Sequence, residues 1–199
     1  MGSKGLKLED VPKYESLIEA IKRAKRDLDR GRHRLRDLAL VSILVFTGCR
    51  LGEALKLRVE DIDLKARTVR IHQEKKGGEF HRIVPIPSNL FWEIIERYLR
   101  RFPRKDMKLF DITDRQVRNV VYKFTKRYLR VKVRPHALRH SYAIFILKKT
   151  KDLEAVRRLL GHSDYKWLKK YLDYTQEDLE EELREAFSMV EGYHHTMLS

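Results

Sequence analysis

The chain has 199 residues, of which 42% are hydrophobic, so it resembles a folded globular protein rather than a disordered one. Its 44 Lys and Arg outnumber its 29 Asp and Glu, and the formal charge of +15 favours a polyanionic partner, most simply nucleic acid. An acidic membrane surface is the alternative partner. A single cysteine, Cys49, excludes an intramolecular disulfide and a cysteine-based metal cluster.

We find no transmembrane segment and no export signal in the sequence. It has no uninterrupted apolar stretch of about 18 residues and no pattern of a cleaved signal peptide. We therefore expect a cytoplasmic protein that associates with the nucleoid.

The first third of the chain predicts two helices and a short third one. Apolar residues recur at three- and four-residue steps over 7–29, which indicates an amphipathic helix. Residues 22–36 hold eight basic side chains and two acidic ones, so this face is either solvated or follows a phosphate backbone. The nearly continuous apolar run 35–46 predicts a buried helix, and Gly48 can end it in a left-handed conformation before Arg50 starts the next helix.

A β-hairpin is predicted in the middle of the chain. Residues 68–71 and 80–86 have strand-like composition, and the two glycines between them can supply a hairpin turn. Two lysines, Lys75 and Lys76, lie at its tip. Pro85 and Pro87 end the sheet element, and Ser88 can cap a helix that runs to Leu99.

Capping residues predict the later helices. Thr113 and Gln116 form a capping box, and six basic residues with no acid follow over 123–134. Pro135 suits the first position of a helix that continues with His136. The remaining signals are those of one helix capped by Asp152 and closed by Gly161, and of another capped by Ser163 that contains Tyr171.

The C-terminal part of the chain reverses the sign of the charge. Residues 177–185 hold six acidic side chains, whereas Leu179, Leu183, Phe187 and Val190 keep an apolar stripe. Such a stripe suits docking on another helix, either of the same chain or of a neighbouring copy.

A widely spaced set of polar residues could carry chemistry. Two arginines, two histidines and a tyrosine are what phosphoryl transfer from DNA to a protein hydroxyl needs if no metal is used, because guanidinium groups hold phosphate oxygens in bidentate fashion. Helical spacing also places the second arginine beside the first histidine in a first turn, whose amide dipoles favour an anion. The set is Arg50, His136, Arg139, His162 and Tyr171.

Each of these residues could also have a purely structural role. A single arginine in so basic a chain is usually solvated, and His140 is expected to form a hydrogen bond within the fold. On position alone, Tyr165, Tyr171 and Tyr174 are equal candidates for a nucleophile or members of an aromatic core stripe. The hairpin lysines suit a solvated loop, or a mobile arm that donates a proton to a leaving 5′ oxygen.

Four segments, in order, resemble the conserved boxes of the tyrosine recombinase family, the Xer and phage-integrase type of site-specific DNA recombinase. They are TGCRLGEALKLRVEDID, KKGGEFHRIVPIP, PHALRHSYA and LLGHSDYKWLKKY, and the resemblance covers residues from about 35 to 175. The resemblance implies a mainly α fold with a small antiparallel β-sheet, which is the DNA breaking-rejoining catalytic fold.

The resemblance also implies residue roles. Arg50 and Arg139 would clamp the scissile phosphate. The longer interval before Pro85 leaves both hairpin lysines open, and the segment after Tyr171 leaves Tyr174 as a minor candidate. The other implied roles are His136 as acid or base, His162 as donor to a non-bridging oxygen, Lys76 as general acid, Tyr171 as nucleophile at the family's nine-residue offset from His162, and Glu53 and His140 as supporting residues.

The implied reaction is strand cleavage and rejoining through a 3′-phosphotyrosine link, with neither cofactor, metal nor ATP. The implied partner is double-stranded DNA at a specific recombination site, with a tetramer in the synaptic complex. We expect residues 1–176 to form the catalytic domain, without the family's N-terminal core-binding domain, and 177–199 to form an acidic tail. The alternatives are a type IB topoisomerase, which would carry lysine in place of His136, and a non-catalytic DNA-binding module.

Overall fold

The computed structural model describes residues 11–75, 78–161 and 187. The chain divides into two units, Met1–Gly161 and His162–Ser199, and the fold described below is that of the first. The predicted acidic segment over 177–185 and the predicted boundary at residue 176 lie outside the described residues.

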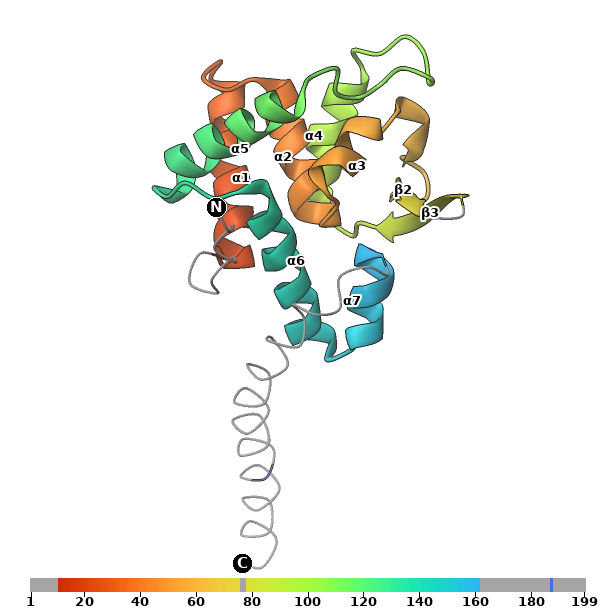
Figure 1. Cartoon of the computed structure of the whole chain (residues 1–199). Helices are drawn as coiled ribbons and strands as arrows, with labels where there is room; N and C mark the ends of the chain where they lie inside the picture. The colour runs from red at the N-terminus through yellow and green to blue at the C-terminus, as the bar shows by residue number, and fades with distance from the viewer. Residues whose placement is uncertain (1–10, 76–77, 162–186, 188–199) are drawn as a thin grey trace, which may run out of the picture. The chain divides into compact units, whose positions relative to one another are not determined.

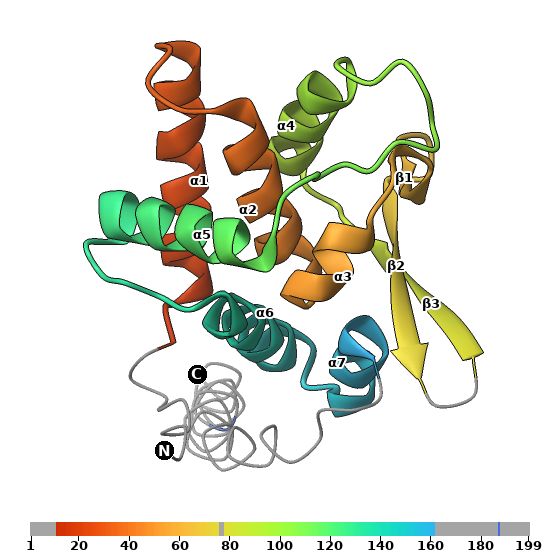
Figure 2. The ribbon, with the colours of Figure 1, turned by 45° about the horizontal axis from the view of Figure 1, so that its top comes forward.

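Helix α2 (Leu35–Thr47) forms the centre of this unit. Its side chains are buried from Leu38 to Thr47, because the segment is apolar on every face. It packs against α1 (Tyr14–Asp29), α4 (Asn89–Leu99), α5 (Asp114–Leu129) and α6 (Pro135–Thr150). Figure 2 shows α5 lying across α1 and α2. The prediction of a buried helix over 35–46 is confirmed.

The first helix begins later than the sequence indicated. We predicted a helix over 7–29, but Lys13 is extended and α1 starts at Tyr14. Pro12 opposes an earlier start, because the residue before it, Val11, is disfavoured in the helical region. From Tyr14 onward the predicted apolar face is present, with Leu17 and Ile21 fully buried.

The hairpin is part of a three-stranded antiparallel sheet in the order β1-β2-β3. The strands are β1 (Ile62–Asp63), β2 (Thr68–Lys75) and β3 (Gly78–Pro85), and Val69 pairs with Val84. Strand β2 is longer than the predicted 68–71, since its polar end continues to pair with β3. Strand β1 was not predicted, because two residues are too few to show a periodic pattern.

Helices α4, α5 and α7 (Leu153–Leu160), labelled in Figure 1, start where their caps predicted. Ser88 Oγ accepts from the Phe91 N–H at 3.4 Å, and Thr113 Oγ1 accepts from the Gln116 N–H at 3.3 Å. Asp152 Oδ1 likewise accepts from the Ala155 N–H at 3.0 Å, at the start of α7. The short helix α3 (Leu51–Lys56) and the 3-10 helix η2 (Val59–Asp61) connect α2 to the sheet.

The structure is thus mostly helical with one small antiparallel sheet, as predicted. Among the described residues, we find no helix with both the length and the apolar character needed to cross a membrane.

Candidate active site

A pocket of about 240 Å³ lies at the starts of α3 and α6 and along the first half of α5. Arg50, His136 and Arg139, which are far apart in the sequence, all line it. Figure 2 shows α3, α5 and α6 meeting at this place. The pocket therefore unites three of the residues that the sequence singled out for phosphate chemistry.

Arg139 is held rigidly at this pocket. Its side chain is only 1% exposed. One terminal nitrogen donates to the carbonyl oxygen of Gly48 at 2.7 Å and the other donates to that of Leu160 at 2.9 Å. The guanidinium group is thereby fixed between the end of α2 and the end of α7, so it does not need to be ordered when an anion arrives.

Glu53 positions Arg50 through hydrogen bonds to its backbone and side chain. Its carboxylate accepts hydrogen bonds from the Arg50 backbone N–H at 2.8 Å and from the Arg50 guanidinium at 3.1 Å. Arg82 on β3 donates to the same carboxylate at 3.2 and 2.8 Å. Arg50 and Glu53 therefore contact each other on one face of α3, and Arg82 binds the same carboxylate from β3.

The charge of this carboxylate is stabilised although it is buried. Burial alone would raise the pKa of Glu53, and this is the largest single effect. The hydrogen bonds and charge of Arg82, the N–H of Arg50 and the charge of Arg139 together outweigh burial and hold the pKa below its usual value. Glu53 is therefore ionised at neutral pH and can orient the arginines around it.

His136 and His140 lie one turn apart at the start of α6. His136 is exposed in the pocket, whereas His140 is buried, and the ring centroids are 4.7 Å apart in an edge-on arrangement. Pro135 occupies the first helical position, so the first-turn amides lie beside His136. The geometry suits His136 for contact with a bound anion and His140 for support of its ring.

Three residues that line the same pocket were not among the predicted site residues, although Arg134 belongs to the predicted basic run over 123–134. Arg118 and Tyr122 lie on α5, four residues apart, and Arg134 directly precedes Pro135. Arg118 contacts Asp114 at 3.6 Å, and the Lys132 ammonium lies 4.5 Å from the centre of the Tyr122 ring. The helical spacing of Arg118 and Tyr122 was visible, but the surface that they face depends on how α5 packs.

Arg82 was also missed. Its position in the predicted hairpin gave no sign of burial, because a lone arginine in a strand is usually solvated. The only signal was the alternation of β3, which places Arg82 on the same face as the buried Val84.

Several predicted residues lie outside the described residues, namely Lys76, His162, Tyr171 and the alternative nucleophiles Tyr165 and Tyr174. The backbone of Lys75 ends β2, opposite Gly78. Gly161, which precedes His162, has a φ of +84°, and a Cβ there would lie 1.8 Å from Gln73 Nε2. The last of the four segments therefore contains a glycine that β2 packs against closely.

The described part of the chain offers this pocket several guanidinium groups and one imidazole. Within it, no group of three or more His, Cys, Asp or Glu side chains is arranged to hold a metal ion. Cys49 also lines the pocket, but burial, together with the nearby Glu53 carboxylate, raises the pKa of its thiol to about 11. The pocket is chemically suited to hold a phosphate and to stabilise additional negative charge on it.

The chain is similar to a known protein family and to several of its members. The sequence profile of the phage integrase family matches residues 10–178. The chain is 32% identical over 191 residues to tyrosine recombinase XerA of Pyrococcus furiosus, which covers 92% of this chain and 62% of the relative.

Two solved structures are similar as well. A crystal structure of XerA recombinase superposes with a TM-score of 0.61 at 25% identity, over 86% of this chain and 60% of that one. XerH bound to a palindromic difH substrate, in a post-cleavage complex, gives a TM-score of 0.63 at 28% identity, over 94% of this chain and 53% of that one. The chain thus spans between about half and three fifths of the length of these relatives.

Proposed function

Because the chain belongs to the phage integrase family, we propose that it is a site-specific recombinase that cleaves and rejoins DNA strands through a 3′-phosphotyrosine intermediate. The observation that carries this proposal is the pocket that unites Arg50, His136 and Arg139. Two positioned guanidinium groups can bind both non-bridging oxygens of a phosphodiester and stabilise the charge of the pentavalent transition state.

The proposed cleavage step balances with groups of this chain. The Tyr171 hydroxyl attacks the phosphorus, its oxygen forms the new P–O bond, and the bond to the 5′ oxygen breaks. Lys76 supplies the proton to that leaving oxygen, with Lys75 as the alternative donor. His136 accepts the proton of the Tyr171 hydroxyl as a base and returns it as an acid when the step is reversed. His162 donates to a non-bridging oxygen. A 5′ hydroxyl of another strand then reverses the step, and the energy of the phosphodiester bond is kept throughout.

The proposed partner is duplex DNA. The structurally similar XerH was solved with its difH substrate, and the charge of +15 suits a polyanion. Exchange of strands between two duplexes needs four cleavages, so we infer a tetramer on paired sites. The proposed reaction places the chain in the cytoplasm, with the nucleoid.

A covalent-trapping experiment tests the proposal. The wild-type protein is incubated with a pool of nicked duplexes of randomised sequence, in which cleavage next to the nick releases a short fragment and leaves the adduct unable to rejoin. We expect a covalent adduct whose mass-mapped peptide carries the DNA on Tyr171. The Tyr171→Phe variant should form none, while Tyr165→Phe and Tyr174→Phe, the matched controls, should still form it.

The result also discriminates between the alternatives. If the wild type forms no adduct, the chain is a non-catalytic DNA-binding module, and an adduct on Tyr174 would move the nucleophile to that residue. Resolution of a synthetic Holliday junction made from the trapped sequence is expected of a recombinase. Relaxation of supercoiled DNA without junction resolution would indicate a type IB topoisomerase instead.

A further inference from the structure

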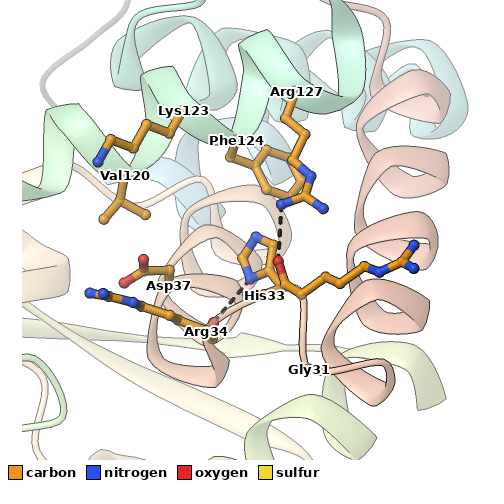
Figure 3. A pocket seen from close by; sticks show the side chains of 9 residues that line it. Gly31, His33, Arg34, Asp37, Val120, Lys123, Phe124 and Arg127 are labelled. Carbon is orange, nitrogen blue, oxygen red and sulfur yellow. Dashed lines mark hydrogen bonds between the residues drawn. The ribbon is translucent and has the colours of Figure 1, made fainter.

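A second pocket, of about 410 Å³, lies between α5 and the loop that joins α1 to α2 (Figure 3). Helix α5 lines both pockets with different faces. Arg118 and Tyr122 face the candidate active site, whereas Lys123 and Arg127, four residues apart, face the second pocket. This pocket is therefore separate from the candidate active site but shares one helix with it.

The walls of this second pocket are fixed by contacts between the loop and α5. Arg127 donates to the carbonyl oxygen of Arg32 at 3.0 Å and to the Asp27 carboxylate at 2.7 Å. The His33 ring packs near the Phe124 ring, and its Nδ1 lies 3.0 Å from the carbonyl oxygen of Arg34 (Figure 3). The pocket is thus built into the fold and does not depend on an ordered ligand.

The charge of the pocket is strongly positive. It is lined by Arg34 and Lys123, both exposed, and by a single acid, Asp37, which is paired with Arg36 at 2.8 Å. Among the residues that the structure describes, no carboxylate lies within ion-pair distance of Arg34 or Lys123. The pocket can therefore accept the charge of an anion without first breaking an ion pair.

Two basic runs that are far apart in the sequence converge here. Arg32 and Arg34 belong to the run over 22–36, and Lys123 and Arg127 belong to the run over 123–134. From the sequence, the first run was equally compatible with a solvated face. Its convergence with the second run on one preformed pocket favours a binding role for both.

We propose that this second pocket binds a backbone phosphate of the duplex, outside the cleaved position. The inference rests on the proposed function, because it assigns the DNA a second contact on the same chain. Along the axis of α5, Lys123 lies about 7.5 Å from Arg118, at 1.5 Å per residue. Phosphates of one strand follow one another every 3.4 Å or so along the duplex axis, so this offset along α5 is comparable to a spacing of a few nucleotides.

Another polyanion could occupy the pocket, namely the acidic segment over 177–185 of this chain or of a second copy. The DNA phosphate is favoured because α5 lines both the second pocket and the candidate active site, so a duplex bound at one lies near the other. The acidic segment becomes an outcome of the experiment.

The experiment measures how DNA affinity depends on salt. Fluorescence anisotropy with a labelled duplex of random sequence gives the slope of log affinity against log salt concentration, to which each phosphate contact contributes about 0.9. We expect the Arg34→Gln/Lys123→Gln variant to lower this slope by about one phosphate contact. The control variant, Arg101→Gln/Lys105→Gln, removes the same charge from exposed positions in the loop that follows α4 and should keep the wild-type slope.

Each outcome decides the proposal. An unchanged slope in the Arg34→Gln/Lys123→Gln variant, or an equal fall in the control, overturns it. Loss of binding to a labelled peptide with the sequence of 177–185, with the DNA slope unchanged, would assign the pocket to the acidic segment and also overturn it. Covalent trapping of the wild type on nicked DNA is scored separately, so failure of the proposed reaction is distinguishable from failure of this pocket.

Discussion

Arg82 donates two hydrogen bonds to the Glu53 carboxylate, at 3.2 and 2.8 Å, and both side chains are buried. Arg82 also donates through Nε to the carbonyl oxygen of Leu159 at 2.7 Å, one residue before the Leu160 carbonyl that Arg139 uses. The Glu53 carboxylate therefore connects Arg50 to β3, and Arg82 connects β3 to the end of α7. The two arginines of the candidate active site are positioned by a shared framework of buried polar contacts.

Breaking this pair should destabilise the fold. We expect Glu53→Gln and Arg82→Gln each to lower the free energy of unfolding by about 3 kcal/mol, because each removes one charge of a buried ion pair and leaves the other charge poorly compensated. The double variant should cost clearly less than the sum, since neither charge then remains. Urea unfolding measures all three values. Arg97→Gln, which breaks the exposed Arg97–Asp29 pair, is the control and should cost less than about 1 kcal/mol. Equal costs for Glu53→Gln and Arg97→Gln would contradict the assigned role.

The same carboxylate predicts a dependence of stability on pH. The folded pKa of Glu53 lies below its usual value, so Glu53 stabilises the fold above the unfolded pKa of about 4.3, and this contribution is lost as pH falls through the folded pKa. The difference in unfolding free energy between wild type and Glu53→Gln should therefore be largest at neutral pH and shrink below about pH 4. A difference that stays constant down to pH 3 would show that Glu53 is not the titrating group.

The fold was predictable where local chemistry decides it. Side-chain caps such as Ser88, Thr113 and Asp152 act within three residues, so they located the starts of α4, α5 and α7 from the sequence. The apolar run of α2 likewise could only be buried. The predicted start of α1 was too early. The apolar periodicity continues back through Val11, whereas Pro12 opposes a helix at that residue.

The candidate site was predictable only in part. Arg50, His136 and Arg139 could be chosen because their boxes resemble a known family. Arg82 and Arg134 could not, because their roles depend on which surface a strand or a loop presents after the helices pack. The alternation of β3 indicates that Arg82 faces the same side as Val84, but no sequence pattern indicates that its partner there is Glu53.

Arg134 should assist the proposed cleavage without supporting the fold. It is exposed and lines the pocket beside His136, so its guanidinium can contact the bound phosphate. A hydrogen bond to a charged group contributes about 1.5–3 kcal/mol, so Arg134→Gln should slow adduct formation by about tenfold or more. Its unfolding free energy should stay within about 0.5 kcal/mol of wild type. The exposed Arg101→Gln serves as the control, and an adduct rate for Arg134→Gln equal to that of this control would remove Arg134 from the site.

Cys49 should be unreactive in the folded protein. Burial raises the pKa of its thiol to about 11, so its thiolate fraction at pH 8 is roughly two orders of magnitude below that of an ordinary cysteine. Iodoacetamide should therefore modify the native protein slowly and the guanidinium-denatured protein quickly, as followed by intact mass. Because Cys49 is the only cysteine of the chain, one added group reports it directly. Equal rates in both states would contradict this burial.

Gly48 should be intolerant of a side chain. Its φ is +60°, and a Cβ there would lie 2.5 Å from Tyr142 Cδ1 and 2.9 Å from Leu160 Cδ2. An alanine in the left-handed backbone conformation lowers the stability of the fold by about 1–2 kcal/mol, and overpacking lowers it by about 1–3 kcal/mol more. We therefore expect Gly48→Ala to lower the free energy of unfolding by about 2–5 kcal/mol, as measured by urea denaturation.

The same substitution should also disturb the candidate active site, because the Gly48 carbonyl oxygen accepts the hydrogen bond from Arg139 at 2.7 Å. Adduct formation by Gly48→Ala should fall even at a temperature where the variant is fully folded by circular dichroism. Gly52→Ala is the matched control, since Gly52 lies in α3 and a Cβ there has no atom within 4 Å. Alanine favours a helix over glycine by up to about 1 kcal/mol, so this control should be neutral or more stable. If both variants lost stability equally, the close contact of Gly48 with Tyr142 would not be the cause.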